Sequence, residues 1–107
     1  MEMAMYIMQI LRSQMAIVWS WGFHSAYVIK DGLEFSVEGF LFKGDVQVVY
    51  EGGSDTFVVR LLNPDRTTKE EHTNIYLDNL VDVIDGAVEK NESNAEYAQR
   101  FETEYHL

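Results

Sequence analysis

The sequence predicts an α+β domain of two layers, in which an antiparallel meander of four or five strands is packed by an N-terminal and a C-terminal helix. Apolar residues recur at helical spacing near both ends of the chain, and they alternate with polar residues in between. The connections between the alternating segments are short, which favours antiparallel over parallel pairing. With 107 residues, we assign one domain to residues 1–90 and a short helix or flexible acidic tail to residues 91–107.

The first helix is predicted over about residues 2–17. Met, Ala, Leu, Ile and Gln predominate there, and all of these except Ile are good helix formers. Their apolar members recur at the spacing of one buried helix face. This face consists of Ala4, Ile7, Met8, Leu11, Met15 and Val18.

The segment from Trp19 to His24 is predicted to be the first strand. Trp19, Trp21 and Phe23 alternate with small or polar residues, which is the period of a strand. These aromatic side chains either belong to the core or form a platform for a planar ligand. We favour the core, because no basic residue is interleaved with them, and we place His24 on the opposite face.

Turn residues divide the middle of the chain into further strands. Asp31-Gly32 predicts a tight turn. Of the two glycines that flank residues 40–42, we favour Gly44 as the next turn, within residues 43–45. Further strands are predicted at 33–38, 46–50 and 56–62, and the polar segment 67–73 is either a charged edge strand or a loop.

A second long helix is predicted to follow a cap at residues 73–74. Its apolar stripe consists of Leu77, Leu80, Val81, Ile84 and Val88. Four carboxylates, spaced by four, three and four residues, line the other side: Asp78, Asp82, Asp85 and Glu89. Gly86 weakens this helix, which suggests that another element approaches closely there.

Three segments of the chain are distinctive: residues 19–24 (WSWGFH), residues 39–44 (GFLFKG) and residues 75–85 (IYLDNLVDVID). They resemble an uncharacterised family of short bacterial proteins that are often associated with mobile genetic elements. The resemblance covers about residues 18–89. It implies a compact α+β domain and a bacterial cytoplasm, and it transfers no activity, ligand or catalytic residue to this chain.

The chain is strongly acidic, since 8 Lys and Arg oppose 18 Asp and Glu for a formal net charge of −10. This balance disfavours nucleic acids and anionic membranes as direct partners, because both are bound through clustered cations. The lack of cysteine excludes disulfides, a thiol nucleophile and a cysteine-bound metal. Polar residues interrupt the apolar N-terminal stretch, so we expect no membrane span. A signal peptide is not expected either, because the only early charge is the negative one of Glu2. We therefore expect a cytoplasmic location.

These features favour a small non-enzymatic protein-binding or accessory module that presents an acidic helix face to a basic protein partner. The residues assigned to this surface are Asp78, Asp82, Asp85, Glu89, Trp19, Trp21 and His24. No catalytic residue, cofactor site or metal site is assigned. Phosphate-binding and nucleophile motifs are missing from the sequence, and the three histidines lack the spacing of metal ligands.

Three alternatives stay open. In the first, the acidity mimics nucleic-acid charge and occupies a DNA- or RNA-binding protein. In the second, the chain is a small enzyme with a site between sheet and helix near His24, since catalytic residues need no linear motif. In the third, the chain is a homodimer that uses an open sheet edge or a C-terminal aromatic row consisting of Tyr97, Phe101 and Tyr105.

Overall fold

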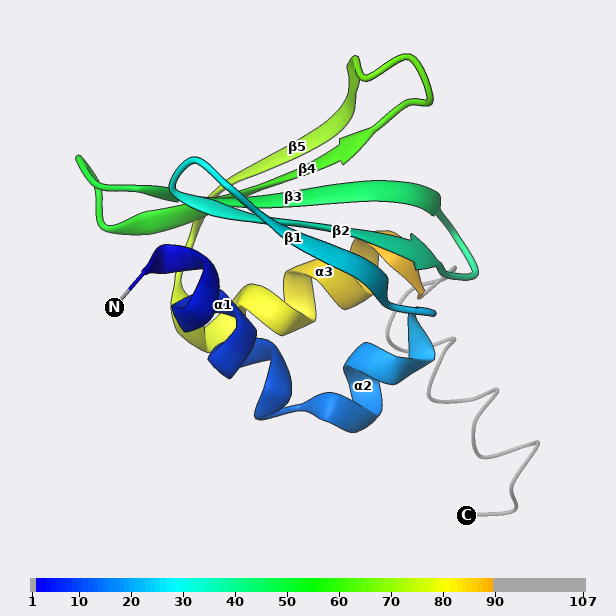
Figure 1. Cartoon of the computed structure of the whole chain (residues 1–107), viewed down its shortest axis with the longest axis horizontal. Coiled ribbons are helices and arrows are strands. Elements are labelled where there is room, and N and C mark those ends of the chain that lie inside the picture. The colour runs from blue at the N-terminus through cyan, green and yellow to red at the C-terminus, as the bar shows by residue number, and fades with distance from the viewer. Residues whose placement is uncertain (1, 90–107) are drawn as a thin grey trace.

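In the computed structural model, which describes residues 2–89, five strands form one antiparallel sheet in the order of the chain, and helices cover one of its faces (Figure 1). The elements are α1 (Met3–Arg12), α2 (Met15–Ser20), β1 (His24–Ile29), β2 (Gly32–Glu38), β3 (Lys43–Glu51), β4 (Thr56–Leu62), β5 (Thr68–Ile75), the 3-10 helix η1 (Leu77–Asn79) and α3 (Leu80–Val88). The predicted α+β architecture is therefore confirmed. The predicted third helix and its aromatic row lie outside the described residues.

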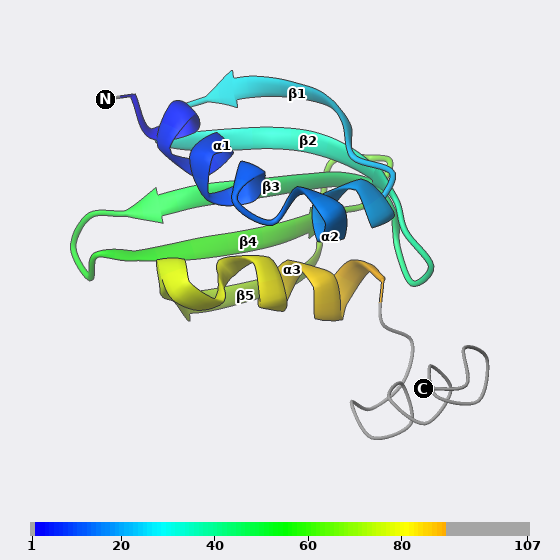
Figure 2. The same cartoon turned by 90° about the horizontal axis from the view of Figure 1, so that it is seen from below.

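The core lies between the sheet and its helices (Figure 2). Alternate residues of β2, β3 and β4 point into it: Leu33, Phe35, Val37, Val46, Val48, Phe57, Val59 and Leu61. From the other layer, α1 packs on β1 and β2, and α3 packs on β5. Leu80 and Ile84 of α3 are fully buried, which confirms the apolar stripe predicted for this helix. Leu77 is the exception, because it lies in η1 and is half exposed.

The N-terminal helical region consists of two helices rather than the single one predicted. α1 ends at Arg12 and α2 begins at Met15. At the break, the Ser13 hydroxyl donates to the Ile10 carbonyl at 2.6 Å, and Gln14 leaves the helical region with φ −133° and ψ 49°. A serine hydroxyl that bonds to the backbone in this way competes with helix continuation.

The strand predicted to start at Trp19 is wrong, because Trp19 lies in α2 and β1 begins only at His24. Gly22 ends the helix at φ 68°, the left-handed conformation that glycine adopts after helices, and its amide donates to the Trp19 carbonyl at 3.1 Å. The tryptophans therefore face different ways. Trp21 is fully buried and belongs to the core, whereas Trp19 is 64% exposed.

The second hairpin turns at residues 39–42, so the turn predicted at residues 43–45 is wrong. The Gly39 amide donates to the Phe42 carbonyl at 3.0 Å and closes the turn. α3 determines its position, since the Val88 carbonyl accepts the amides of Leu41 and Phe42 at 2.8 and 3.3 Å. A Cβ on Gly39 would lie 2.4 Å from that carbonyl oxygen, so only glycine fits there.

The polar segment after the third hairpin is a charged edge strand rather than a loop. It forms β5, which pairs with β4 only. The turn that precedes it is closed by the Arg66 amide, which donates to the Asn63 carbonyl at 2.9 Å. Lysine and glutamate on such an edge discourage pairing with another chain.

Gly39→Ala is expected to destabilise the fold by about 1–3 kcal/mol, because the added methyl group would collide with Val88. The measurement is urea unfolding followed by circular dichroism. Gly86→Ala is the matched control. A Cβ at Gly86 meets nothing within 4 Å, so the close approach suggested there is wrong, and the change is expected to stabilise α3 by about 0.5–1 kcal/mol. Equal effects of the two changes would contradict this assignment of the close contact.

Candidate functional site

The four carboxylates of the predicted acidic face have different roles in the fold. Asp85 Oδ1 accepts the Trp21 indole N–H at 3.0 Å, and Glu89 accepts a backbone amide of the β2–β3 turn at 3.1 Å. Both therefore hold neighbouring elements to α3. Asp78 in η1 and Asp82 in α3 are exposed, so these are the two carboxylates of the predicted face that remain open to solvent.

His24 lies beside Ser25 and Glu38, a grouping that the sequence did not suggest because Glu38 comes from the next strand. Its Nδ1 is 2.8 Å from the Ser25 hydroxyl, and its Nε2 is 3.6 Å from the Glu38 carboxylate. The order Ser25, His24 and Glu38 resembles that of a nucleophile, a base and an orienting acid. However, 3.6 Å is too long for a hydrogen bond, and the side chains of His24 and Glu38 are at least half exposed. The grouping fits a solvated surface cluster.

The pairing of β1 also decides where His24 points. It lies opposite Ser36 of β2, whose neighbours Phe35 and Val37 point into the core. His24 is therefore on the sheet face that the helices leave uncovered, and not between sheet and helix. Neither of the two hollows described below includes His24.

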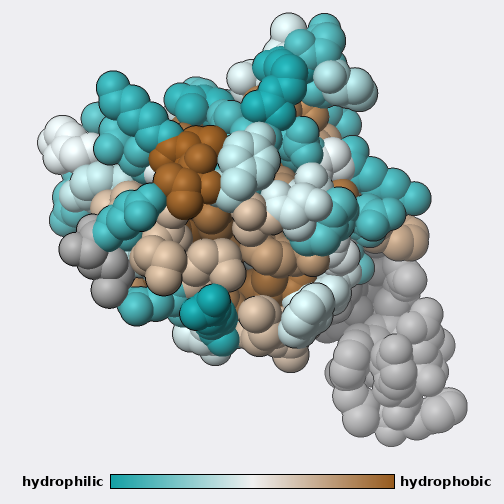
Figure 3. Space-filling view, viewed as in Figure 1, coloured by the Kyte–Doolittle hydropathy of each residue, from teal (hydrophilic) through white to brown (hydrophobic). Residues whose placement is uncertain are grey.

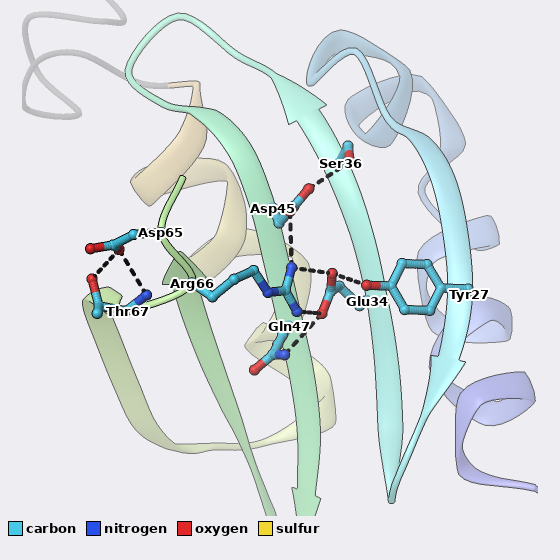
Figure 4. A network of polar contacts seen from close by, with 8 residues as sticks. All are labelled: Tyr27, Glu34, Ser36, Asp45, Gln47, Asp65, Arg66 and Thr67. Carbon is cyan, nitrogen blue, oxygen red and sulfur yellow. Dashed lines mark hydrogen bonds and ion pairs between the residues drawn. The ribbon is translucent and has the colours of Figure 1, made fainter. Parts of the chain in front are cut away.

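The uncovered face of the sheet carries a polar network around Glu34 (Figure 4). Arg66, in the turn between β4 and β5, reaches across β3 to this carboxylate. Its two terminal nitrogens each donate to a Glu34 oxygen at 2.9 Å, and one also donates to Asp45 at 3.1 Å. Gln47 donates to Glu34 at 2.9 Å, and the Tyr27 hydroxyl donates to it as well.

The Glu34 carboxylate is hydrogen-bonded within this network, so the network is structural rather than a reactive site. Glu34 is only 1% exposed, and the Arg66 guanidinium is the main reason that the pKa of its carboxyl is lowered to about 2. The same contact raises the pKa of Arg66. The pKa of Tyr27 is also raised, because its hydroxyl donates to the Glu34 carboxylate. The network therefore holds the β4–β5 turn over the sheet.

Two adjoining hollows form a groove between α1 and η1, which we call the α1–η1 groove. Their volumes are about 260 and 380 Å³, and Tyr6, Leu77 and Asp78 border both. The smaller is completed by Tyr50, Asp55, Phe57 and Tyr76, and the larger by Gln9, Ile10, Ser13 and Gln14. Of these lining residues, all within the described part of the chain, two are aspartates and none is basic.

One stripe of α1 forms the first wall of the groove. This stripe consists of Tyr6, Gln9, Ile10 and Ser13. The last three follow Tyr6 by three, four and seven residues, so all four share one side of the helix. The neighbouring stripe, with Ile7 and Leu11, is buried on the sheet. The sequence revealed only the buried stripe, because the polar residues of the other made it resemble a solvated helix face.

The junction of β5 and η1 forms the second wall. β5 continues to the buried Ile75, so the helix cap predicted at residues 73–74 is wrong. Instead, the Tyr76 amide donates to Asn79 Oδ1 at 3.0 Å, which fixes the start of η1. This turn leaves Tyr76 62% and Leu77 48% exposed, at the rim of the groove.

The end of the β3–β4 hairpin forms the floor of the smaller hollow. Tyr50 and Phe57 meet edge to face, with ring centres 5.7 Å apart. The Tyr50 hydroxyl donates to Asp55 Oδ1 at 2.5 Å, and this contact raises the pKa of Tyr50. The phenol therefore stays a neutral donor that fixes the aspartate. Aromatic and acidic groups of two distant segments, residues 50–57 and 76–78, thus meet in one hollow.

No family model, curated protein or solved structure matches this chain. The resemblance to short bacterial proteins and the cytoplasmic location stay predictions. Within residues 2–89, no helix is both long and apolar enough to cross a membrane. In the same range, no three acidic or histidine side chains gather closely enough to hold a metal ion.

Acidification is expected to remove the stabilisation that Glu34 provides. Its pKa is about 2 in the folded chain against an ordinary 4.5, so the stabilisation is fully present above pH 4.5 and is lost as the pH falls towards 2. This contribution amounts to at most about 3 kcal/mol. The measurement compares the unfolding free energy of the wild type with that of Glu34→Gln between pH 7 and pH 3.

The difference in unfolding free energy between the wild type and Glu34→Gln should narrow on acidification. Glu51→Gln, which changes an exposed carboxylate of β3, serves as the control and should stay within about 0.5 kcal/mol of the wild type. A gap between wild type and Glu34→Gln that does not change with pH would contradict the ionic role of Glu34.

Proposed function

We propose that this chain is a small non-enzymatic module that binds a basic, partly apolar segment of another protein in the α1–η1 groove. One observation carries the proposal: the groove combines exposed apolar side chains with two aspartates and no basic lining residue among those described. Of the four carboxylates expected from the sequence, only Asp78 lines this groove, and Asp55 of the β3–β4 hairpin joins it there.

The apolar part of the groove favours a protein segment as its occupant. Tyr76 and Leu77 stand at the rim, and Ile10 lines the wall. Covering such side chains provides about 25 cal/mol for each Å² of apolar area that leaves water. Exposed apolar side chains that lie together are typical of interaction sites.

The charge of the chain favours a basic partner. The net charge of −10 repels anions and attracts a cationic segment over a distance of about one Debye length. A mimic of nucleic acid would need carboxylates spaced like phosphates across several elements. Asp55 and Asp78 instead share one hollow with aromatic rings and Leu77, a lining that suits an amino-acid side chain better than the extended carboxylate array of such a mimic.

A second apolar surface allows a matched comparison. β1 is an edge strand, and Figure 3 shows apolar side chains gathered over it and over the helical layer below. Val28 of β1 is 57% exposed, which is close to the exposure of Leu77. This edge is also where the alternative of a homodimer would place its contact.

The proposal predicts that a labelled 12-residue peptide of alternating leucine and arginine binds the protein, as measured by fluorescence anisotropy. Leu77→Ser is expected to weaken binding about tenfold, since the lost apolar contact is worth about 1.4 kcal/mol. Raising sodium chloride from 50 to 500 mM is expected to weaken it further, because salt screens the two aspartates.

Val28→Ser is the control, and it should leave the affinity unchanged. A loss of affinity in Val28→Ser alone would place the binding surface at the β1 edge and contradict binding in the groove. An affinity that does not change with salt would contradict the electrostatic part of the proposal.

A further inference from the structure

The smaller hollow of the α1–η1 groove is built from aromatic rings of four different elements. They are Tyr6 of α1, Tyr50 of β3, Phe57 of β4 and Tyr76 at the start of η1. Asp55 and Asp78 complete the lining together with Leu77. The hollow has a volume of about 260 Å³, which suits one large side chain rather than a folded element.

This combination of rings and carboxylates selects for a cation. Aromatic faces carry a partial negative charge and attract a positive group placed over them. A neutral apolar side chain would strip water from Asp55 and Asp78 without replacing its hydrogen bonds, which is costly. A cationic side chain contacts the rings and also supplies donors to both aspartates.

The hollow is held in shape before any ligand arrives. The edge-to-face contact with Phe57 and the hydrogen bond to Asp55 fix the Tyr50 ring from two sides. On the opposite wall, Asn79 fixes the backbone of Tyr76. Side chains that are already ordered lose less freedom on binding, which favours affinity.

We propose that this hollow receives an arginine side chain of the partner, an inference that rests on the proposed function and specifies its ligand. A guanidinium group is planar and stacks on tyrosine rings, and its fork of N–H donors matches a carboxylate. Lysine presents a smaller, more strongly hydrated charge. A methylated ammonium group satisfies the rings but offers fewer donors to Asp55 and Asp78.

The test uses the full chain and three peptides that differ only at their central residue. The peptides are otherwise neutral and apolar, and they carry arginine, lysine or norleucine at that position. The arginine peptide is expected to bind about fivefold more tightly than the lysine peptide, and both more tightly than the norleucine peptide. Calorimetry or fluorescence anisotropy measures the three affinities.

Variants at the rim show whether the ring and the carboxylate cause this preference. Tyr76→Leu keeps the apolar bulk but removes the ring, and Asp78→Asn removes the charge; each is expected to abolish the preference for arginine. Tyr76→Phe keeps the ring and should preserve it. Trp19→Leu changes an exposed aromatic side chain outside the groove and should also preserve it. Circular dichroism of each variant verifies the fold.

The outcomes separate this inference from the proposed function. Equal affinities for the arginine and lysine peptides, both lowered by Leu77→Ser, would overturn the arginine site and leave the groove as a binding surface. Equal affinities for all three peptides, with no effect of any groove variant, would overturn both. A preference for arginine that survives Tyr76→Leu and Asp78→Asn would place the recognition elsewhere.

Discussion

The sheet has one apolar face, and two separate helical segments cover it, α1 with α2 before the sheet and η1 with α3 after it. At one end, Trp21 joins them: its indole N–H donates to Asp85 of α3 at 3.0 Å, and its ring stacks on Phe35 with centres 6.5 Å apart. At the other end of the helical layer, where Figure 2 shows α1 and the start of α3, α1 and η1 are the two walls of a groove. Because two separate segments cover the sheet, they are joined by the bond from Trp21 to Asp85 at one end and leave a groove between them at the other.

The carboxylates of the uncovered sheet face and of the α1–η1 groove have different surroundings. On the uncovered face, the Glu34 carboxylate is buried and bound by Arg66, Gln47 and Tyr27, so its charge is neutralised within the fold. At the groove, Asp55 is fixed by a neutral phenol, so its negative charge is not compensated by this contact. Under the proposed function, the acidic chain uses one surface for its own stability and offers another to a cationic partner.

Local patterns in the sequence predicted the elements that depend on local periodicity. The strand over residues 56–62 and the buried stripe of α3 are confirmed, because alternation and helical spacing directly reflect burial. The turn at Gly39 was missed since it depends on Val88, a residue far along the chain. The contact between Glu34 and Arg66 and the α1–η1 groove were missed for the same reason. Their side chains come together only when the sheet forms.

Amide chemical-shift mapping of the ¹⁵N-labelled protein with the leucine–arginine peptide tests most directly whether the α1–η1 groove is the binding surface. The largest shifts are expected at Tyr6, Ile10 and Asp55 and at residues 76–78, on both walls and at the hairpin end of the groove. Shifts centred on β1, or on the uncovered face around Arg66, would contradict the groove as the site of binding.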